Sequence, residues 1–352
     1  SAHGVGVFRI FDALNDIRNL KVAIDAALAC PEKPHVQGCL VYTISPVHSN
    51  ESFVELAVKL EGMGCHSVCI KDMSGLLKPY VAEDLVKKLK SSVKIPIELH
   101  THCTSGFGHA TYLKAIEAGV DIIDTALAPF SSDTSQPCTE TMVAMLEGEE
   151  RDTGLDRQAM TPISKYFLQV KQDLIKTFGL KGYFDINPNV LDFQIPGGML
   201  SNLANQLKEA GMEDRYQDLL DEMPRVRKDI GYPPLVTPSS QIVGTMATFN
   251  VMSGERYKLV PKDLARGKFG RTPVAVDRNF LTETLGIDPE EIIEDCSIED
   301  AKAKTFAEFK EELKGKGYLN PTDEDVLSYA LFPQVAEEFF KTHYKPITAY
   351  IK

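Results

Sequence analysis

The chain has 352 residues, with 38 basic against 50 acidic side chains and a net charge of −12. A surface with this excess of negative charge repels nucleic-acid phosphates and anionic membranes, so neither is an expected partner. No apolar stretch reaches the ~20 residues that a membrane-spanning helix needs. The first residues also lack the charged and apolar segments of a secretory signal. We therefore expect a cytoplasmic globular protein.

The seven cysteines are odd in number, scattered, and often embedded in apolar segments. This distribution favours buried, reduced thiols over a disulfide framework. Cys65 and Cys69 form a CxxxC spacing, but no second pair follows them, so a zinc ribbon is not expected.

Short apolar segments alternate with helical patterns through the first 150 residues. The expected strands are 4–11, 36–43, 66–70, 95–100 and 120–124. The expected helices are 15–30, 51–63, 81–90, 109–118 and 139–146. This alternation indicates βα units and a parallel sheet.

The number and spacing of these units suggest part of a barrel. Successive strands start about 30 residues apart, which suits a (β/α)8 barrel or an open doubly wound sheet. No GxGxxG loop follows a strand, which disfavours the dinucleotide-binding version of the open sheet. A barrel needs eight units and five are found, with the first strand at the very start. We therefore expect units 4–8 of a barrel that lacks its first three strands.

Long helical patterns dominate after residue 157. They cover 162–178, 199–210, 215–230 (interrupted near Pro224), 242–250 and 298–316, with Pro- and Gly-rich loops between them, and the tail 337–352 is amphipathic and then polar. The predicted organisation is thus five βα units in 1–156 and a helical extension, packed on the barrel, in 157–352.

Two strand ends carry candidate functional side chains, as expected for the carboxyl-terminal face of a barrel. His100 and His102 are two residues apart at the end of the fourth unit's strand, so both imidazoles point the same way and can reach one metal ion. A pair of core or surface histidines is the alternative.

Lys71 directly follows an apolar strand, which would direct its charge into the barrel mouth. An ordinary lysine is a cation and cannot ligate a metal. Carbamylation by CO2 would convert it into an anionic ligand. The alternatives are an ion pair with Asp72 or a surface lysine.

Two loops are candidates for substrate contact. Segment 196–202 contains two glycines before a helix, and the exposed N–H groups at that helix start could hold an anion. The alternative is a plain helix start capped by Ser201 or Asn202. Segment 237–241 is either a cap for the helix 242–250 or a polar wall of a site.

Segments throughout the chain resemble a known family. They are 8–15 (FRIFDALN), 70–77 (IKDMSGLL), 99–102 (LHTH), 196–203 (PGGMLSNL) and 236–244 (VTPSSQIVG). All five resemble the carboxyltransferase domain shared by pyruvate carboxylase (including its separate B subunit), the oxaloacetate decarboxylase α subunit and the keto-acid subunit of transcarboxylase. The resemblance runs from residue 4 to about 345 in the same order. It implies a (β/α)8 TIM barrel with a helical funnel.

The resemblance implies biotin-dependent carboxyl transfer between carboxybiotin and a 2-keto acid such as pyruvate or oxaloacetate, through metal-assisted enolate chemistry. It implies a divalent metal (zinc, manganese or cobalt) held by carbamylated Lys71, His100 and His102. A fourth ligand, an aspartate, would lie on the first barrel strand. The glutamine and arginine that hold the keto acid's carboxylate would lie on the first and third strands. All of these fall in the missing segment.

The resemblance also assigns roles to residues of this chain. Lys71 and Ser201 are the expected catalytic residues, Ser201 as the hydroxyl that passes a proton to biotin. Arg9, Gly198, Ser201 and Asn202 are the expected contacts to substrate and biotin. The sequence departs from the pyruvate carboxylase pattern at three positions: Cys103 replaces a typical aspartate, Ser201 a typical threonine and Gln241 a typical lysine. Gln241, together with the segment 199–201, resembles the branch formed by the decarboxylase, the transcarboxylase and the separate B subunit.

The carrier signature Ala-Met-Lys-Met does not occur in the sequence. Biotin is therefore expected on a separate carrier domain or subunit, and the resemblance further implies a homodimer. Two other functions stay open. One is a metal-dependent aldol-type lyase or synthase on the same barrel, of the hydroxymethylglutaryl-CoA lyase kind, which the Lys71 motif and the helical half disfavour. The other is an inactive fragment that needs a companion N-terminal barrel segment.

Overall fold

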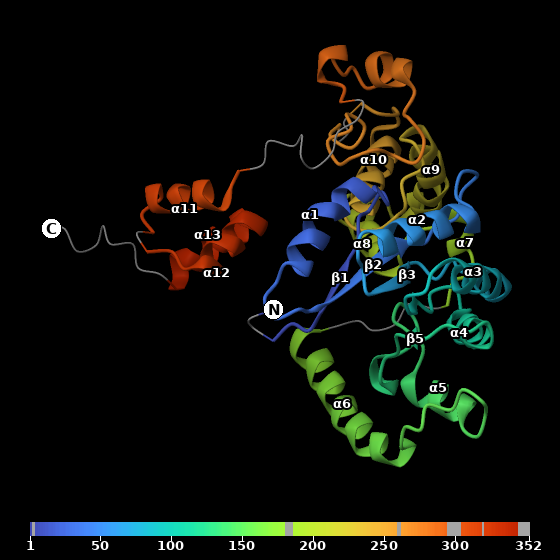
Figure 1. Cartoon of the computed structure of the whole chain (residues 1–352). Helices are drawn as coiled ribbons and strands as arrows, with labels where there is room; N and C mark the ends of the chain where they lie inside the picture. The colour runs from blue at the N-terminus through green and yellow to red at the C-terminus, as the bar shows by residue number, and fades with distance from the viewer. Residues whose placement is uncertain (2–3, 180–185, 259–261, 294–303, 319, 344–352) are drawn as a thin grey trace. The chain divides into compact units, whose positions relative to one another are not determined.

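A five-stranded parallel sheet forms the first part of the chain. The computed structural model describes residues 1, 4–179, 186–258, 262–293, 304–318 and 320–343. The strands pair in chain order, each parallel to the next (Figure 1). They are β1 (Val7–Ile10), β2 (His35–Val41), β3 (Ser67–Asp72), β4 (Ile97–Thr101) and β5 (Ile122–Ile123). The predicted strand order and parallel pairing are therefore confirmed.

A helix follows each strand. The five helices are α1 (Ile17–Leu28), α2 (Asn50–Gly62), α3 (Pro79–Ser92), α4 (Gly108–Glu117) and α5 (Thr139–Leu146), with the short turn η1 (Ala128–Phe130) before α5. Local signals explain where they begin. The Asp16 carboxylate accepts from the backbone N–H of Arg18 at the start of α1. Ser49 and Ser52 form a capping box at the start of α2.

The sheet is curved. Neighbouring strands lie about 4.8 Å apart, so β1 and β4 would be separated by about 14 Å in a flat sheet. Yet Arg9 on β1 is bonded to Glu98 on β4, and its Nη1 lies 2.5 Å from Oδ2 of Asp124, just after β5. The side chains of one face therefore converge, as on the inner wall of a barrel. The α/β barrel-type fold expected from the sequence is confirmed in these five units.

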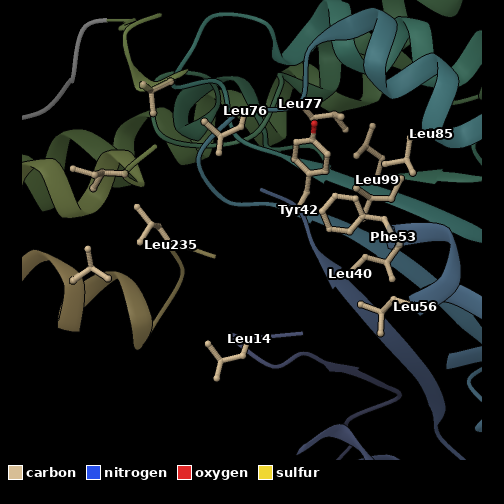
Figure 2. Packing of buried hydrophobic residues seen from close by; sticks show 14 of the residues in the cluster. Leu14, Leu40, Tyr42, Phe53, Leu56, Leu76, Leu77, Leu85, Leu99 and Leu235 are labelled. Carbon is tan, nitrogen blue, oxygen red and sulfur yellow. The ribbon is translucent and has the colours of Figure 1, made fainter. Parts of the chain in front are cut away.

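One hydrophobic core joins the strands to the helices around them. Residues of β2, β3 and β4 are almost entirely buried, and Figure 2 shows Tyr42 and Phe53 beside Leu40, with the two rings 5.2 Å apart. The same cluster includes Leu235, from the loop before α10 (Ser239–Ser253). The helical half thus packs into the core of the strand half.

The helical half contains α6 (Arg157–Phe178), α7 (Val190–Phe193), α8 (Gly197–Glu209), α9 (Tyr216–Asp229) and α10, with short turns η2 (Glu213–Arg215), η3 (Phe280–Thr284) and η4 (Pro289–Glu291). The predicted interruption at Pro224 is wrong, because α9 continues through this residue. Several apolar side chains of α9 are fully buried, and this packing outweighs the backbone hydrogen bond that proline removes.

The chain divides into two compact units, residues 1–298 and 299–352. The sequence-based boundary at 156/157 lies inside the first unit, whose core includes residues from α7 to α10 as well as from the strands. The second unit contains α11 (Phe306–Gly315), α12 (Asp323–Leu331) and α13 (Pro333–His343), with its own small core around Leu313 and Phe340. The helix predicted over 298–316 starts only at Phe306, after a Thr305 cap. The predicted helix 298–316 and the predicted tail 337–352 also include residues 298–303 and 344–352, which lie outside the described residues.

Six cysteines lie among the described residues, and all six are free thiols, as the sequence predicts. Five of them are buried. Cys296 lies outside the described residues. Within the described part of the chain, none of the helices combines the length and the apolar character that a membrane crossing requires.

Gly75 joins the loops that follow β3 and β4. Its φ is +68°, and the Ser105 hydroxyl donates to its carbonyl oxygen at 2.5 Å. A methyl group at this position would lie 2.5 Å from the carbonyl oxygen of His102. Only glycine therefore allows the two loops to approach this closely.

We expect Gly75→Ala to destabilise the chain more than Gly148→Ala. Both glycines have positive φ, but a methyl group at Gly148 meets nothing within 4 Å. The left-handed backbone alone costs roughly 1–2 kcal/mol, and the contact with His102 should add about 1–3 kcal/mol. Urea unfolding of both variants measures the difference. Equal losses of stability would show that the loops separate freely.

Candidate functional site

Lys71, His100 and His102 lie together at the carboxyl ends of β3 and β4. Lys71 is the direct partner of His100 in the parallel ladder, so the two side chains lie on the same face of the sheet. His102 follows two residues later and belongs to the same face. The structure therefore brings together the three residues that the sequence predicts as metal ligands.

The two imidazoles are held through their Nδ1 atoms. Nδ1 of His100 is 2.7 Å from Oδ2 of Asp124, and Nδ1 of His102 is 2.5 Å from the carbonyl oxygen of Thr134. Carboxylate and carbonyl oxygens only accept, so each Nδ1 carries a proton, and a neutral ring then has its lone pair on Nε2. Burial lowers the pKa of His102 to about 4, which keeps its ring neutral at pH 7.

The Nε2 atoms of the two histidines are 3.1 Å apart. At this distance either one ring donates an Nε2–H to the other, or both Nε2 lone pairs face a third group. In the structure the Gln136 amide nitrogen lies 3.2 Å from Nε2 of His102 and 3.5 Å from Nε2 of His100. A metal ion is an alternative partner, because nitrogen ligands about 2.0–2.1 Å from one ion are roughly 2.8–3.4 Å apart.

The residues present therefore fit a metal ion by the separation and protonation of the two imidazoles. Each donates its second ring N–H to an oxygen, which is the usual arrangement around metal-bound histidine. Among the described residues, no group of three or more His, Cys, Asp and Glu side chains is arranged to hold a metal. A third ligand from this chain would have to be of another type.

Lys71 is the residue nearest to that role. Its Nζ lies 5.0 Å from the centre of the Phe11 ring. Burial lowers the pKa of its amine below the ordinary value for lysine. A larger fraction of the amine is therefore neutral at a given pH, and a neutral amine is the form that reacts with CO2.

Asp72 does not serve as the counter-ion of Lys71. As the next residue in the strand it lies on the opposite face. Its carboxylate accepts from the backbone N–H groups of Leu76 and Leu77 at 2.9 and 2.8 Å, and from the Thr101 hydroxyl at 2.7 Å. Asp72 instead connects the loop after β3 to the end of β4. These bonds hold together the two strand ends that carry Lys71 and His100.

A cavity of about 270 Å³ opens beside His102. Its walls come from the loops after β3 and β4, the start of α8 and the start of α10. The lining residues are Met73, His102, Thr134, Pro196, Gly197, Met199, Asn202, Thr237, Ser240 and Gln241. A second cavity of about 490 Å³ shares Met199, Asn202 and Gln241 with it and continues along α8 and α10. Both loops singled out in the sequence thus line the cavity.

The other predicted site residues differ in their relation to the cavity beside His102. Asn202 lines both cavities. Gly198 and Ser201 lie in the backbone of α8, but their side-chain surroundings lie outside the described residues. Arg9 does not line the cavity beside His102, and its guanidinium is bonded to Gln37, Glu98 and Asp124.

Four residues of the site were not assigned a role from the sequence: Asp124, Thr134, Gln136 and Thr237. Asp124 had a visible signal, since it is the polar residue at the end of the fifth predicted strand. Thr237 belongs to segment 237–241, which the sequence marks only as a helix cap or a polar wall. Thr134 and Gln136 belong to an irregular loop that the tertiary fold brings to the histidines, and nothing in the local pattern marks them.

Comparison with known families covers most of the chain. Residues 40–166 match a family described as HMGL-like, and residues 190–350 match a conserved carboxylase domain. The first match falls on the strand half and the second on the helical half.

Two related proteins match the sequence of this chain over nearly its whole length. It is 46% identical over 346 residues to the B subunit of pyruvate carboxylase from Methanocaldococcus jannaschii, covering 97% of this chain and 60% of that one. It is 42% identical to the methylmalonyl-CoA carboxyltransferase 5S subunit of Propionibacterium freudenreichii subsp. shermanii over 343 residues, covering 96% and 67%. The chain thus spans about three fifths to two thirds of these relatives.

A solved structure gives the same result in three dimensions. The carboxyl transferase domain of Rhizobium etli pyruvate carboxylase with pyruvate and biocytin matches with a TM-score of 0.85 at 31% identity, over 98% of this chain and 61% of that one. The chain therefore belongs to the carboxyltransferase family that includes the pyruvate carboxylase B subunit and the methylmalonyl-CoA carboxyltransferase 5S subunit.

Proposed function

We propose that this chain catalyses biotin-dependent carboxyl transfer between carboxybiotin and a 2-keto acid such as pyruvate or oxaloacetate. The observation that carries the proposal is the convergence of two oriented imidazoles and a half-buried lysine beside a cavity. The Rhizobium etli relative holds pyruvate and biocytin, the biotinylated lysine, which supports these two substrate classes.

His100, His102 and Lys71 would together hold a divalent ion, such as zinc, manganese or cobalt. The ion would supply Lewis-acid polarisation of a ketone oxygen and so favour the enolate of the keto acid. His100 and His102 would offer their Nε2 lone pairs. Lys71 requires a chemical change first, because an ammonium group cannot ligate.

Carbamylation supplies that change. The neutral Nζ of Lys71 attacks the carbon of CO2, and loss of one proton from nitrogen leaves an N-carboxylate. The side chain then carries a negative instead of a positive charge. The lowered pKa of Lys71 favours the step, because it increases the fraction of reactive neutral amine.

The transfer itself would take place in the cavity beside His102. The N–CO2 bond of carboxybiotin breaks, and the ureido nitrogen takes up a proton that originates from the methyl group of pyruvate. The enolate carbon then attacks the released CO2 to form oxaloacetate, and the reverse sequence decarboxylates oxaloacetate. Asn202 and the start of α8 would contact the substrate or biotin, together with Gly198.

A hydroxyl group would relay the proton. The family resemblance assigns this role to Ser201. Thr237 is a second candidate, because it lines the same cavity as His102.

A further part of the proposal is that biotin arrives on a separate carrier domain, that the protein is a homodimer, and that it acts in the cytoplasm. The two family matches support a functional division into barrel (1–156) and helical extension (157–352).

An aldol-type lyase is the second candidate function, favoured by the HMGL-like match over residues 40–166. It would use the same metal site without biotin. The carboxylase-domain match over residues 190–350 favours the carboxyltransferase. Dependence of the reaction on biotin separates the two.

We expect His102→Ala to weaken zinc or manganese binding by at least about 100-fold, because it removes one of the converging lone pairs. Competition with a chromophoric chelator measures the affinity. His35→Ala is the matched control, since His35 begins β2 at the opposite end of the sheet and bonds to Ser67. Equal affinities in the wild type and His102→Ala would remove the metal site from the proposal.

We expect Lys71 to carry a carbamate. The chain equilibrated with ¹³C-bicarbonate should show one carbamate carbonyl signal by NMR, and its metal affinity should rise with bicarbonate concentration. Lys71→Arg should abolish both effects. Lys59→Arg, at an exposed position of α2, should leave them intact. A carbamate signal that persists in Lys71→Arg would place the modification elsewhere.

We expect Ser201→Ala to lower kcat by about 100-fold or more, the usual contribution of a proton-transfer group. The assay measures biotin-dependent pyruvate formation from oxaloacetate. Ser201→Thr should retain most activity, because a hydroxyl group remains. Thr237→Ala is the parallel variant, and a large loss there with full activity in Ser201→Ala would assign the relay to Thr237. Retro-aldol cleavage of a 3-hydroxy acid without biotin would favour the lyase.

A further inference from the structure

Arg9 lies at the centre of a polar network inside the curved sheet. Its Nε donates to the side-chain oxygen of Gln37 at 2.6 Å, and its Nη1 donates to Oδ2 of Asp124 at 2.5 Å. Its Nη2 donates to Glu98 and lies 3.4 Å from Oδ1 of Asp124. The guanidinium therefore spans both oxygens of Asp124, a geometry that fixes a carboxylate plane as well as its charge.

The same Asp124 oxygen that binds Arg9 also accepts from His100. Oδ2 lies 2.7 Å from Nδ1 of His100. The backbone of Asp124 is fixed as well, because its N–H donates to the Leu99 carbonyl at 3.1 Å and its carbonyl accepts from Tyr112 at 2.6 Å. Asp124 thus connects a residue 115 positions away in sequence to one of the two converging histidines.

The two histidines differ in how they are held. His102 is oriented by a backbone carbonyl, that of Thr134, which no substitution removes. His100 is oriented by a carboxylate whose own position depends on Arg9.

We propose that Arg9 is a positioning residue. Through Asp124 it holds His100 with Nδ1 protonated and Nε2 free to bind a metal ion. This inference rests on the proposed function.

A direct contact between Arg9 and the substrate is the competing assignment. Three observations favour the positioning role. All three nitrogens of the guanidinium already donate to Gln37, Glu98 and Asp124. Arg9 does not line the cavity beside His102. The Glu98 side chain that holds it is only 6% exposed, so releasing Arg9 toward a ligand would leave a carboxylate buried without its cation.

Asp124→Asn provides a specific test, because an amide has only one oxygen for two donors. Arg9 can only donate, so it should take the amide oxygen and turn the NH2 group toward His100. The imidazole would then accept at Nδ1 and carry its proton on Nε2, where it cannot ligate. Nitrogen-15 NMR of the metal-free chain should show this reversed tautomer for His100 and an unchanged tautomer for His102.

Removing Arg9 from that variant should reverse the effect. In Arg9→Met with Asp124→Asn, the amide oxygen is free to face His100, so the Nδ1–H tautomer should return. Zinc or manganese affinity should fall about 10- to 100-fold in Asp124→Asn and recover at least severalfold in the double variant. Glu222→Gln is the matched control and should keep the wild-type tautomer, because Glu222 is also a buried acid but bonds to Asn250 and Arg256 instead of the Arg9 network.

Three results would overturn the positioning role. The first is a wild-type tautomer for His100 in Asp124→Asn. The second is a raised KM for the keto acid in Arg9→Met with the tautomer and metal affinity unchanged, which would make Arg9 a substrate contact. The third is a lower melting temperature for Arg9→Met with the tautomer, the metal affinity and KM unchanged, which would make the network structural only. The tautomer is measured without metal, so absence of metal binding in the wild type would count against the proposed function and leave this test valid.

Discussion

The register of β3 against β4 is the constraint on which the site depends. It places Lys71 directly beside His100, and the two-residue period of a strand adds His102 to the same face. A slip of one residue in either strand would turn its side chains to the other face. The register is secured in both strands, because Ile70 and Leu99, which are paired with each other on the opposite face, are fully buried. Hydrophobic packing on one face therefore sets the chemistry on the other.

The curvature of the sheet brings together side chains that the strand register alone would leave apart. In a flat sheet Arg9 could not reach Glu98 or Asp124, and His100 would have no carboxylate to fix its tautomer. The loops depend on similarly close approach: Asp72 binds the loop after its own strand and the Thr101 hydroxyl, and Gly75 lets that loop pass against the His102 carbonyl. Most of these contacts join different βα units, so the site forms only when the units have assembled.

Much of this could be predicted from the sequence, because strand patterns and the i, i+2 rule are local. The five strands, their order, and the grouping of Lys71 with the two histidines follow from such patterns. The partners of the histidines do not, since Thr134 and Gln136 lie in an irregular loop and Arg9 reaches Asp124 across 115 residues. Pro224 shows the opposite error: a strong local signal for a break is overridden by the burial of the helix that contains it. The position of Ser201 in a helix start was visible in sequence, whereas the cavity wall formed by Thr237 needed the tertiary fold.

The charges of the site suggest an order for its assembly. Before modification the proposed site would hold a cation at Lys71, and the negative charge of Asp124 is balanced by Arg9. This arrangement would repel a divalent ion. The proposed carbamylation would change the charge at Lys71 by two units and so turn repulsion into attraction. Because the coupling of two binding events is reciprocal, a bound ion would in turn hold the carbamate against loss of CO2. In this proposal the lysine and the metal form one thermodynamic unit, in which the lowered pKa of Lys71 favours the first step and the hydrogen bonds that orient the histidines favour the second.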